Sequence, residues 1–159
     1  MPTDARFEDA AESALALRAE QPEDLPVMAA LLQDAVLPIT EIRYDRRMRR
    51  LALMINRFRW EDRDAAEARQ RPYERVRSLL VISDVTGVAS QGIDRADADT
   101  ILSILDLAWE PGADGAGRLI LTLAGDGAIA ATVECIGIDL RDVTRPYIAP
   151  SRKAPTHPQ

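Results

Sequence analysis

A chain of 159 residues with 47% apolar and 29% charged residues has the size and composition of one soluble globular domain. Its single cysteine excludes an intrachain disulfide and any zinc site built on paired cysteines. No apolar run approaches the ~18 residues of a membrane helix, and the acidic N-terminus lacks the apolar stretch of a signal peptide. We therefore expect a cytoplasmic protein that makes no membrane contact.

The net charge of −6 is unevenly distributed along the chain. Residues 41–77 hold 12 arginines and 7 acidic residues, a local charge of +5, whereas the rest of the chain carries −11. A GC-rich genome explains the preference for arginine over lysine, but it does not explain the clustering. Because the guanidinium group is a planar fork that matches carboxylate or phosphate, a basic segment in an acidic protein indicates an anionic partner.

The N-terminal part of the chain is predicted to contain a tail, a short strand and one helix. Residues 1–14 are polar and acidic, as in a flexible tail, and residues 14–19 can form a short strand. Over residues 22–36, apolar side chains recur at the three-to-four spacing of a helix that packs on a sheet. Acidic residues in its first turn and Pro38 after its end set the limits of this helix.

After Pro38 the pattern changes to alternation, which predicts β-strands. The strands are expected over residues 39–44, 51–61, 73–83, 85–93, 101–110, 119–124 and 129–135. Residues 62–72 indicate a mobile loop with one helical turn, and residues 125–128 carry the strongest hairpin signal. The segment 136–143 fits either a strand or a helix, and the chain ends in a proline-rich tail over residues 149–159.

The predicted strand 51–61 has two different faces, because alternate residues of a strand point the same way. Its even positions are apolar nearly throughout and are predicted to line the core: Ala52, Met54, Asn56, Phe58 and Trp60. Its odd positions begin with three aliphatic residues. They end with Arg57, Arg59 and Glu61, which are predicted to emerge into solvent.

Arginines also open the predicted strand 73–83, at Arg75 and Arg77. If the two strands pair antiparallel, these side chains share a face with the arginines of strand 51–61. Like charges opposite each other are destabilising, so an offset register, nearby glutamates or an anionic ligand must relieve them. The candidate residues for binding an anion or a partner are Arg57, Arg59, Glu61, Arg75 and Arg77.

Three interpretations of this arginine cluster remain open. A surface lattice of arginine and glutamate is the simplest, a contact with an acidic protein is the second, and a contact with nucleic acid is the third. RNA-binding sheets expose aromatic side chains on which bases stack. Phe58 and Trp60 are predicted to lie in the core, so a nucleic-acid partner is disfavoured.

No other residue type stands in a pattern that predicts chemistry. His157 lies in the proline-rich tail without a partner to orient it as a base. Cys135 has the parity of a small core residue at the end of a predicted strand. The aspartates within 94–99 and 139–142 lack the spacing of a calcium loop. We predict no catalytic residue, no metal site and no cofactor, which favours a protein that is not an enzyme.

Four short motifs together resemble a known family: LLQDAV at 31–36, NRFRWE at 56–61, RVRS at 75–78 and VEC at 133–135. They are similar to an uncharacterised alphaproteobacterial family, domain of unknown function 2948, over about residues 15–148. That family has no assigned activity, cofactor or catalytic residues. The resemblance therefore implies only a single bacterial cytoplasmic domain.

These features predict an α+β domain over residues 15–148. One N-terminal helix packs on a mostly antiparallel, twisted sheet of six or seven strands in meander order; an open, PH-like barrel is a variant that needs a C-terminal helix from residues 136–143. The favoured function is a non-enzymatic interaction module that binds an acidic protein, or its own copy, through the arginine-bearing end of the sheet or an exposed edge strand. The alternative is a small-anion-binding domain or enzyme with a pocket framed by Arg57, Arg59, Arg75, Arg77 and Glu61.

Overall fold

The computed structural model describes residues 14–148 and Pro155. Most of the predicted N-terminal tail (1–14) and C-terminal tail (149–159), including His157, lies outside the described residues. The described chain forms one antiparallel sheet with short helices, which confirms the broad α+β prediction. The sheet has eleven strands, so the predicted number of six or seven is wrong. The strands are β1 (Ala16–Ala19), β2 (Val36–Pro38), β3 (Ile42–Asp45), β4 (Arg50–Phe58), β5 (Glu74–Ile82), β6 (Val85–Gln91), β7 (Ile101–Pro111), β8 (Gly117–Leu123), β9 (Gly127–Val133), β10 (Ile138–Asp142) and β11 (Tyr147–Ile148).

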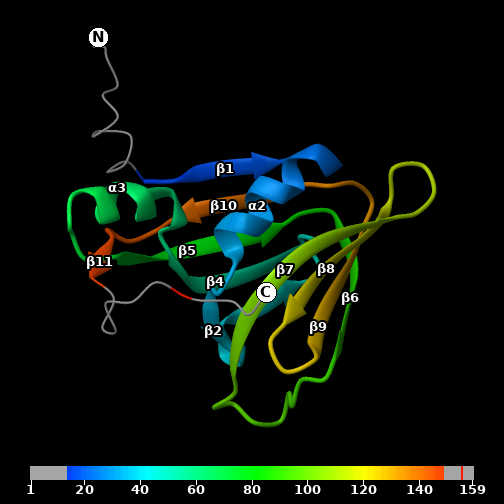
Figure 1. Ribbon diagram of the computed structural model, residues 1–159. Coiled ribbons are helices and arrows are strands. Elements are labelled where there is room, and N and C mark those ends of the chain that lie inside the picture. Colours follow the sequence, from blue (N-terminus) through cyan, green and yellow to red (C-terminus); the bar gives the residue numbers. More distant parts are fainter. Residues whose placement is uncertain (1–13, 149–154, 156–159) are drawn as a thin grey trace.

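The strands follow the order β1-β10-β5-β4-β2-β7-β8-β9-β6, with β3 added to β4 and β11 added to β5. The predicted meander holds only locally, because β10 inserts between β1 and β5. β2 joins two halves of the sheet, since Val36 pairs with Asn56 of β4 and with Ser103 of β7. One half contains β1, β10, β5 and β4, and the other contains β7, β8, β9 and β6 (Figure 1).

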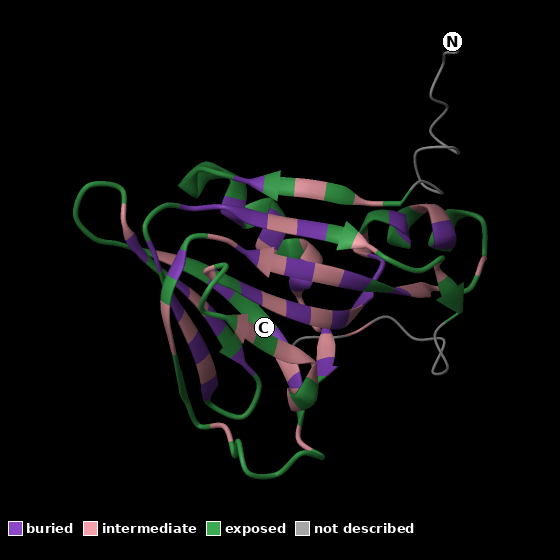
Figure 2. Ribbon diagram, turned by 180° about the vertical axis from the view of Figure 1, so that it is seen from behind, coloured by how far each residue is buried: buried purple, intermediate pink, exposed green. Residues whose placement is uncertain are grey.

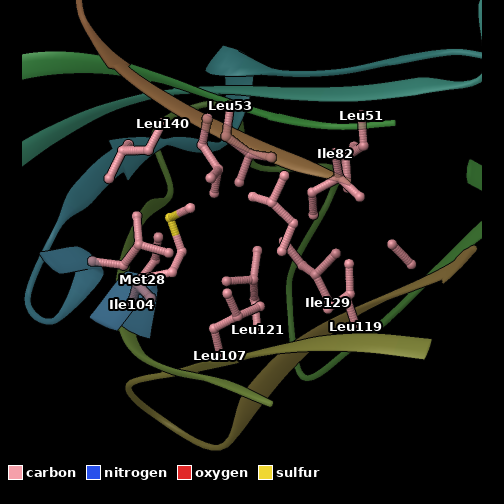
Figure 3. Packing of buried hydrophobic residues seen from close by; sticks show 14 of the residues in the cluster. Met28, Leu51, Leu53, Ile82, Ile104, Leu107, Leu119, Leu121, Ile129 and Leu140 are labelled. Atoms are coloured by element: carbon pink, nitrogen blue, oxygen red, sulfur yellow. The ribbon is translucent and has the colours of Figure 1, made fainter. Parts of the chain in front are cut away.

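The hydrophobic core lies between these two halves. Leu51 and Leu53 of β4 project toward Leu121 of β8 and Ile129 of β9, while Met28 closes one side (Figure 3). All five side chains are less than 5% exposed. Burying an aliphatic side chain of this size contributes about 1.5–3 kcal/mol relative to leaving it in water, so aliphatic residues build this core with little aromatic help.

β4 buries mainly the face opposite to the predicted one, although Phe58, at an even position, is fully buried as predicted. Its odd positions Leu51, Leu53 and Ile55 are almost completely buried, and the next one, Arg57, is buried as well. The even positions Ala52, Met54 and Asn56 are only half-buried. The prediction was wrong because an arginine at the end of an aliphatic face was taken as a sign of exposure, whereas here the nearby Glu61 and the distant Asp142 accompany it inside.

Two α-helices are present in the described residues, so the prediction of a single helix is wrong. The 3-10 turn η1 (Pro22–Asp24) leads into α2 (Leu25–Leu32), whose apolar face packs on β7 and β4. α2 ends before the predicted limit because Asp34 adopts a φ of 64° and its N–H bonds to the backbone of β7. A second 3-10 turn, η3 (Trp60–Asp62), leads into α3 (Arg63–Ala68). Neither α2 nor α3 is long and apolar enough to cross a membrane.

The structure also settles the segments that the sequence left open. Residues 136–143 contain the strand β10, so they do not supply the C-terminal helix of a PH-like barrel. Residues 39–44 begin with the 3-10 turn η2 (Ile39–Glu41) before β3. The predicted hairpin between β8 and β9 is confirmed, and Gly125 and Asp126 take φ values of 81° and 68° in its turn. Glycine and aspartate tolerate this left-handed conformation better than most residues.

Candidate functional site

The four predicted arginines do not share one face of the sheet. β4 and β5 pair antiparallel as predicted, with Arg57 opposite Val76 and Phe58 opposite Arg75. Directly opposite residues lie on the same face, so Arg57 lies on the core face, whereas Arg75 and Arg77 lie on the outer face. The expected common face is wrong because β4 turns its odd positions inward and β5 turns its even positions inward.

Arg57 is enclosed at the end of β4, and each N–H of its guanidinium group has an acceptor. Nη1 and Nη2 donate to the two carboxylate oxygens of Glu61 at 2.8 Å each. Nη2 also donates to Asp142 Oδ1 at 2.9 Å, and Nε donates to Ser78 Oγ at 3.0 Å. Nη1 also donates to the backbone carbonyl oxygen of Phe58 at 3.4 Å. An arginine has five N–H donors, so this side chain has none left for an external anion.

Asp142, at the end of β10, is also held from several sides. Ser78 Oγ donates to its Oδ1 at 2.7 Å, and the backbone N–H of Leu15 donates to its Oδ2 at 2.9 Å. The backbone N–H of Asp142 in turn donates to the carbonyl oxygen of Leu15 at 2.9 Å. This one carboxylate therefore ties β10, β5 and the residue that precedes β1 around the buried guanidinium group.

A second group of charges lies beside the first, around Arg59 and Asp62. Arg59 donates to Glu74 at the start of β5, and its Nη1 lies 3.7 Å from Asp62 Oδ2. Arg71 donates to both carboxylate oxygens of Asp62 at 3.0 Å. Arg59 Nε lies 3.8 Å from Glu61, which links the two groups. These contacts fasten η3 and α3 to the start of β5.

The local pKa shifts follow from this pairing. Burial on its own lowers the pKa of Arg57, but the hydrogen bonds and charges of Glu61 and Asp142 outweigh burial and raise it. Burial on its own raises the pKa of Asp62, but the hydrogen bond from Arg71 and the charge of Arg59 outweigh burial and lower it. Both groups therefore stay ionised at neutral pH, with their charges balanced inside the protein.

Arg75 is held differently, by neutral oxygens on the outer face. Its Nε donates to Asn56 Oδ1 at 2.6 Å. Its Nη2 donates to the backbone carbonyl oxygens of Asn56 at 3.0 Å and Asp34 at 3.2 Å. Burial is the main cause that lowers the pKa of Arg75, and the charges of Tyr147 and Asp34 offset only part of it. The contacts fix the direction of this guanidinium group at the edge of the face.

Arg77 and Arg141 lie close together on the same outer face. Leu79 of β5 stands opposite Arg141 of β10 and opposite Met54 of β4. Arg77 is two residues before Leu79, so it lies diagonal to Arg141. Both arginines are exposed, and neither forms an ion pair with a residue that the structure describes. Leu79 and Met54 are half-buried beside them.

Arginine exceeds acid across the outer face of β3, β4, β5, β10 and β1, which we call the outer basic face. Its charged residues are Arg18, Arg43, Asp45, Arg50, Arg75, Arg77, Asp139 and Arg141. Arg18 and Asp139 neutralise each other at 2.6 Å. A hollow of about 510 Å³ lies on this face, lined by Arg50 and Val81 among others. Figure 2, seen from behind, shows β1, β10 and β5 with no described helix in front of them.

Over residues 15–157 the sequence matches the family described as "Protein of unknown function (DUF2948)". The chain belongs to the DUF2948 family. The resemblance noted in the sequence is therefore confirmed for the family itself. No curated protein and no solved structure matches the chain.

Sequence reasoning found two of the six arginines on the outer basic face of this DUF2948 domain, Arg75 and Arg77, and missed the other four, including Arg141 and Arg50. Arg141 lies in the segment that fitted either a strand or a helix, so its face was not assigned. Arg50 lies next to the predicted hairpin connection and was not assigned to a face either. Asp142, the buried partner of Arg57, is 85 residues away in sequence, and no local pattern indicates such a contact.

The remaining candidates in the DUF2948 domain were Cys135 and the acidic residues. Cys135 is exposed, so its predicted core position is wrong, because β9 ends at Val133 and the chain turns there. Its thiol donates to Asp84 Oδ2 at 3.3 Å, and this hydrogen bond is the main cause that raises the pKa of Cys135. Within the described part of the chain, no three acidic, histidine or cysteine side chains gather as a metal site.

Proposed function

We propose that this DUF2948 domain is an interaction module that contacts an acidic protein partner through its outer basic face. The observation that carries the proposal is the diagonal pair Arg77 and Arg141, which is exposed and has no carboxylate partner among the described residues. Like charges at this spacing repel each other. Acidic side chains of a partner would relieve the repulsion and gain two charge-assisted hydrogen-bond donors.

The surroundings of this pair also support a protein partner. Met54, Leu79 and Val81 are half-buried aliphatic residues on the same face. Protein interfaces combine an apolar centre with arginine, which is enriched there relative to the rest of the surface. Arg75 is already held by Asn56, so little conformational entropy is lost when it meets a partner.

A small-anion pocket built on Arg57 and Arg59 receives less support. Arg57 is 0% exposed and its donors are taken by residues of the chain itself. An incoming anion would have to displace Glu61 and Asp142, and a buried carboxylate that loses its cation carries a large penalty.

A short polyglutamate peptide tests the proposal when it is titrated into the isotope-labelled protein. At about 0.15 M salt, where interactions beyond ~8 Å are screened, we expect amide shifts confined to β4, β5 and β10. The variant Arg77→Glu/Arg141→Glu is expected to bind at least ~10-fold more weakly, the equivalent of about 1.4 kcal/mol.

The matched control is Arg47→Glu/Arg95→Glu, which changes the net charge equally at exposed sites outside the strands of this face. It should lose less than about threefold in affinity. Equal losses in both variants would mean attraction by net charge alone and would overturn the proposal. Tighter binding of a thymidine oligonucleotide at the same amides would instead indicate a nucleic-acid partner. Phosphate-induced shifts centred on Arg57 and Glu61 would support the small-anion alternative.

A further inference from the structure

A cleft of about 1150 Å³ opens between β3 and β6. Among the described strands, β3 pairs only with β4 and β6 pairs only with β9, and β6 lies at the outer end of its half of the sheet (Figure 1). The backbone edges of β3 and β6 therefore border the cleft without a neighbouring strand. Its apolar lining includes Ile42, Leu51, Val88 and Ile129.

The two bordering strands meet at one end of the cleft. The backbone N–H of Val85 donates to the carbonyl oxygen of Arg49 at 2.9 Å. The hydroxyl group of Tyr44 donates to the carbonyl oxygen of Val85 at 3.3 Å. β6 runs away from this junction, and its far end at Gln91 continues into the loop 92–100. Arg95 and Ala98 place that loop at the far part of the cleft.

β6 lacks the features that usually protect an edge strand. Proteins guard such edges with charged side chains, prolines or bulges. The seven residues of β6, Val85–Gln91, include no charged residue and no proline. Its one bulge falls between Val85 and Gly87, beside the junction, so the pairing from Val88 onward is regular. A regular, uncharged edge next to an apolar floor is the kind of surface to which an extended peptide adds as a strand.

The charge of the cleft differs between its two ends. The turn at the junction, residues 45–50, holds four arginines and one aspartate, and Arg46 and Arg49 line the cleft. Arg49 pairs with Glu134, whereas Arg46 is exposed and has no ion pair with a described residue. The loop 92–100 at the other end lines the cleft with Arg95, but it also holds three aspartates just outside the lining, so its net charge is −2. This polarity favours a ligand whose negative end lies at the junction.

We infer that the cleft binds an extended peptide that adds as a strand antiparallel to β6 and carries carboxylates at its C-terminal end. A chain antiparallel to β6 runs from Gln91 toward Val85, so its C-terminal end meets Arg46. Antiparallel addition continues the pattern of β9 and β6 and is slightly more stable than parallel pairing. Alternate side chains of the peptide enter the apolar floor. This site is separate from the outer basic face, so either proposal can fail alone.

Fluorescence anisotropy with labelled peptides tests the inference. The probe is a peptide of the length of β6, seven residues, with alternating valine and threonine and two glutamates at its C-terminal end. The first comparison peptide has the two glutamates at its N-terminal end instead. The second comparison peptide has two lysines at its C-terminal end in place of the glutamates of the probe. We expect the probe to bind at least ~10-fold more tightly than either. Equal affinities of the probe and the first comparison peptide would overturn the proposed direction of the bound strand.

Two arginines of the same turn give a matched pair of variants. Arg46 lines the cleft, whereas its neighbour Arg47 does not, and both are exposed. Arg46→Glu is expected to weaken binding of the probe about tenfold, whereas Arg47→Glu should weaken it less than about threefold. Equal effects would show that the carboxylates do not reach Arg46 and would overturn the assignment of the junction end.

Backbone pairing is tested on the peptide, so that the fold of the protein is not disturbed. Two probes are N-methylated at alternate residues, one set at odd positions and the other at even positions. Only the set whose N–H groups face β6 should lose binding, because strand addition requires those hydrogen bonds. Full binding of both sets would overturn strand addition.

Hydrogen exchange should show that amides of β6 become protected when the probe binds. If sedimentation shows a dimer and the β6 amides are already protected in the absence of peptide, a second copy of the chain covers this edge. That result would overturn the inference.

Discussion

Replacing Arg57 with methionine tests whether the buried charges hold the end of the sheet together. Methionine retains an unbranched apolar side chain but removes all five hydrogen bonds of the guanidinium group. The side chain of Asp142 is only 3% exposed, so the substitution leaves its carboxylate buried without a cation. Removing one partner of a buried ion pair costs about 3–5 kcal/mol.

Part of that cost can be recovered, because the side chain of Glu61 is 26% exposed and can turn toward water. We therefore expect the lower part of the range, a loss of about 3–4 kcal/mol in the free energy of unfolding. A domain of this size has a stability of roughly 5–15 kcal/mol. Since each kcal/mol shifts the melting temperature by about 2–4 °C at this chain length, the expected decrease is roughly 6–16 °C.

Urea unfolding followed by tryptophan fluorescence measures the free energy directly. A double-mutant cycle with Asp142→Asn should give a coupling energy of at least about 1 kcal/mol between the two side chains. The control is Arg77→Met, the same substitution at an exposed position of the neighbouring strand. It should change stability by no more than about 0.5 kcal/mol.

Transferring charges out of water is costly, and this cost opposes the attraction within the ion pair. If Arg57→Met unfolds at the same or a higher urea concentration than the wild type, desolvation of the ion pair cancels its attraction. The charges would then not stabilise this end of the sheet, and the reasoning above would be refuted.

Three further changes test other parts of the structure. Because the pKa of Asp62 is lowered in the folded protein, its carboxylate gives its full stabilisation at pH values above the ordinary pKa of 3.8 and loses it as the pH falls through the folded-state pKa. Asp62→Asn should therefore flatten the acid side of a plot of melting temperature against pH. An unchanged plot would contradict this expectation. Gly117→Ala should cost about 1–3 kcal/mol, because its Cβ would lie 2.6 Å from an indole ring, whereas Gly87→Ala has nothing within 4 Å and should unfold like the wild type. Because Asp84 raises the pKa of Cys135, Asp84→Asn should lower the pH midpoint of alkylation by iodoacetamide, and an unmoved midpoint would argue against the hydrogen bond.

The sequence predicted the positions of most strands but not which side of them faces the core. Alternation located β4 and β5, and the short connection between them led correctly to their antiparallel pairing. Both faces of β4 are apolar near its start, with Leu51 and Leu53 on one side and Ala52 and Met54 on the other. A period of two separates these residues into faces, but it does not say which face another layer covers.

The burial of the charged residues could not be predicted from local sequence patterns, for a different reason. Glu61 follows Arg57 by four residues and was available as a local partner. Ser78 and Asp142 are brought to Arg57 only by the pairing of β5 with β4 and of β10 with β5. β10 reaches that place after the chain has passed through the other half of the sheet. Without that topology a buried arginine would be prohibitively costly, so the sequence alone favoured exposure.

The same topology explains how an acidic protein obtains a basic face. The segment 41–77 carries a charge of +5 when counted along the chain, but its charges are not spread evenly in space. Glu61, Asp62 and Glu74 pair with Arg57, Arg71 and Arg59, so three acids and three arginines cancel and the other nine arginines and four acidic residues of the segment keep the surplus of +5. Part of this surplus, Arg43, Arg50, Arg75 and Arg77, lies on the outer basic face. Arg77 has no carboxylate partner there among the described residues, because Glu74, the glutamate nearest to it in sequence, is engaged by Arg59.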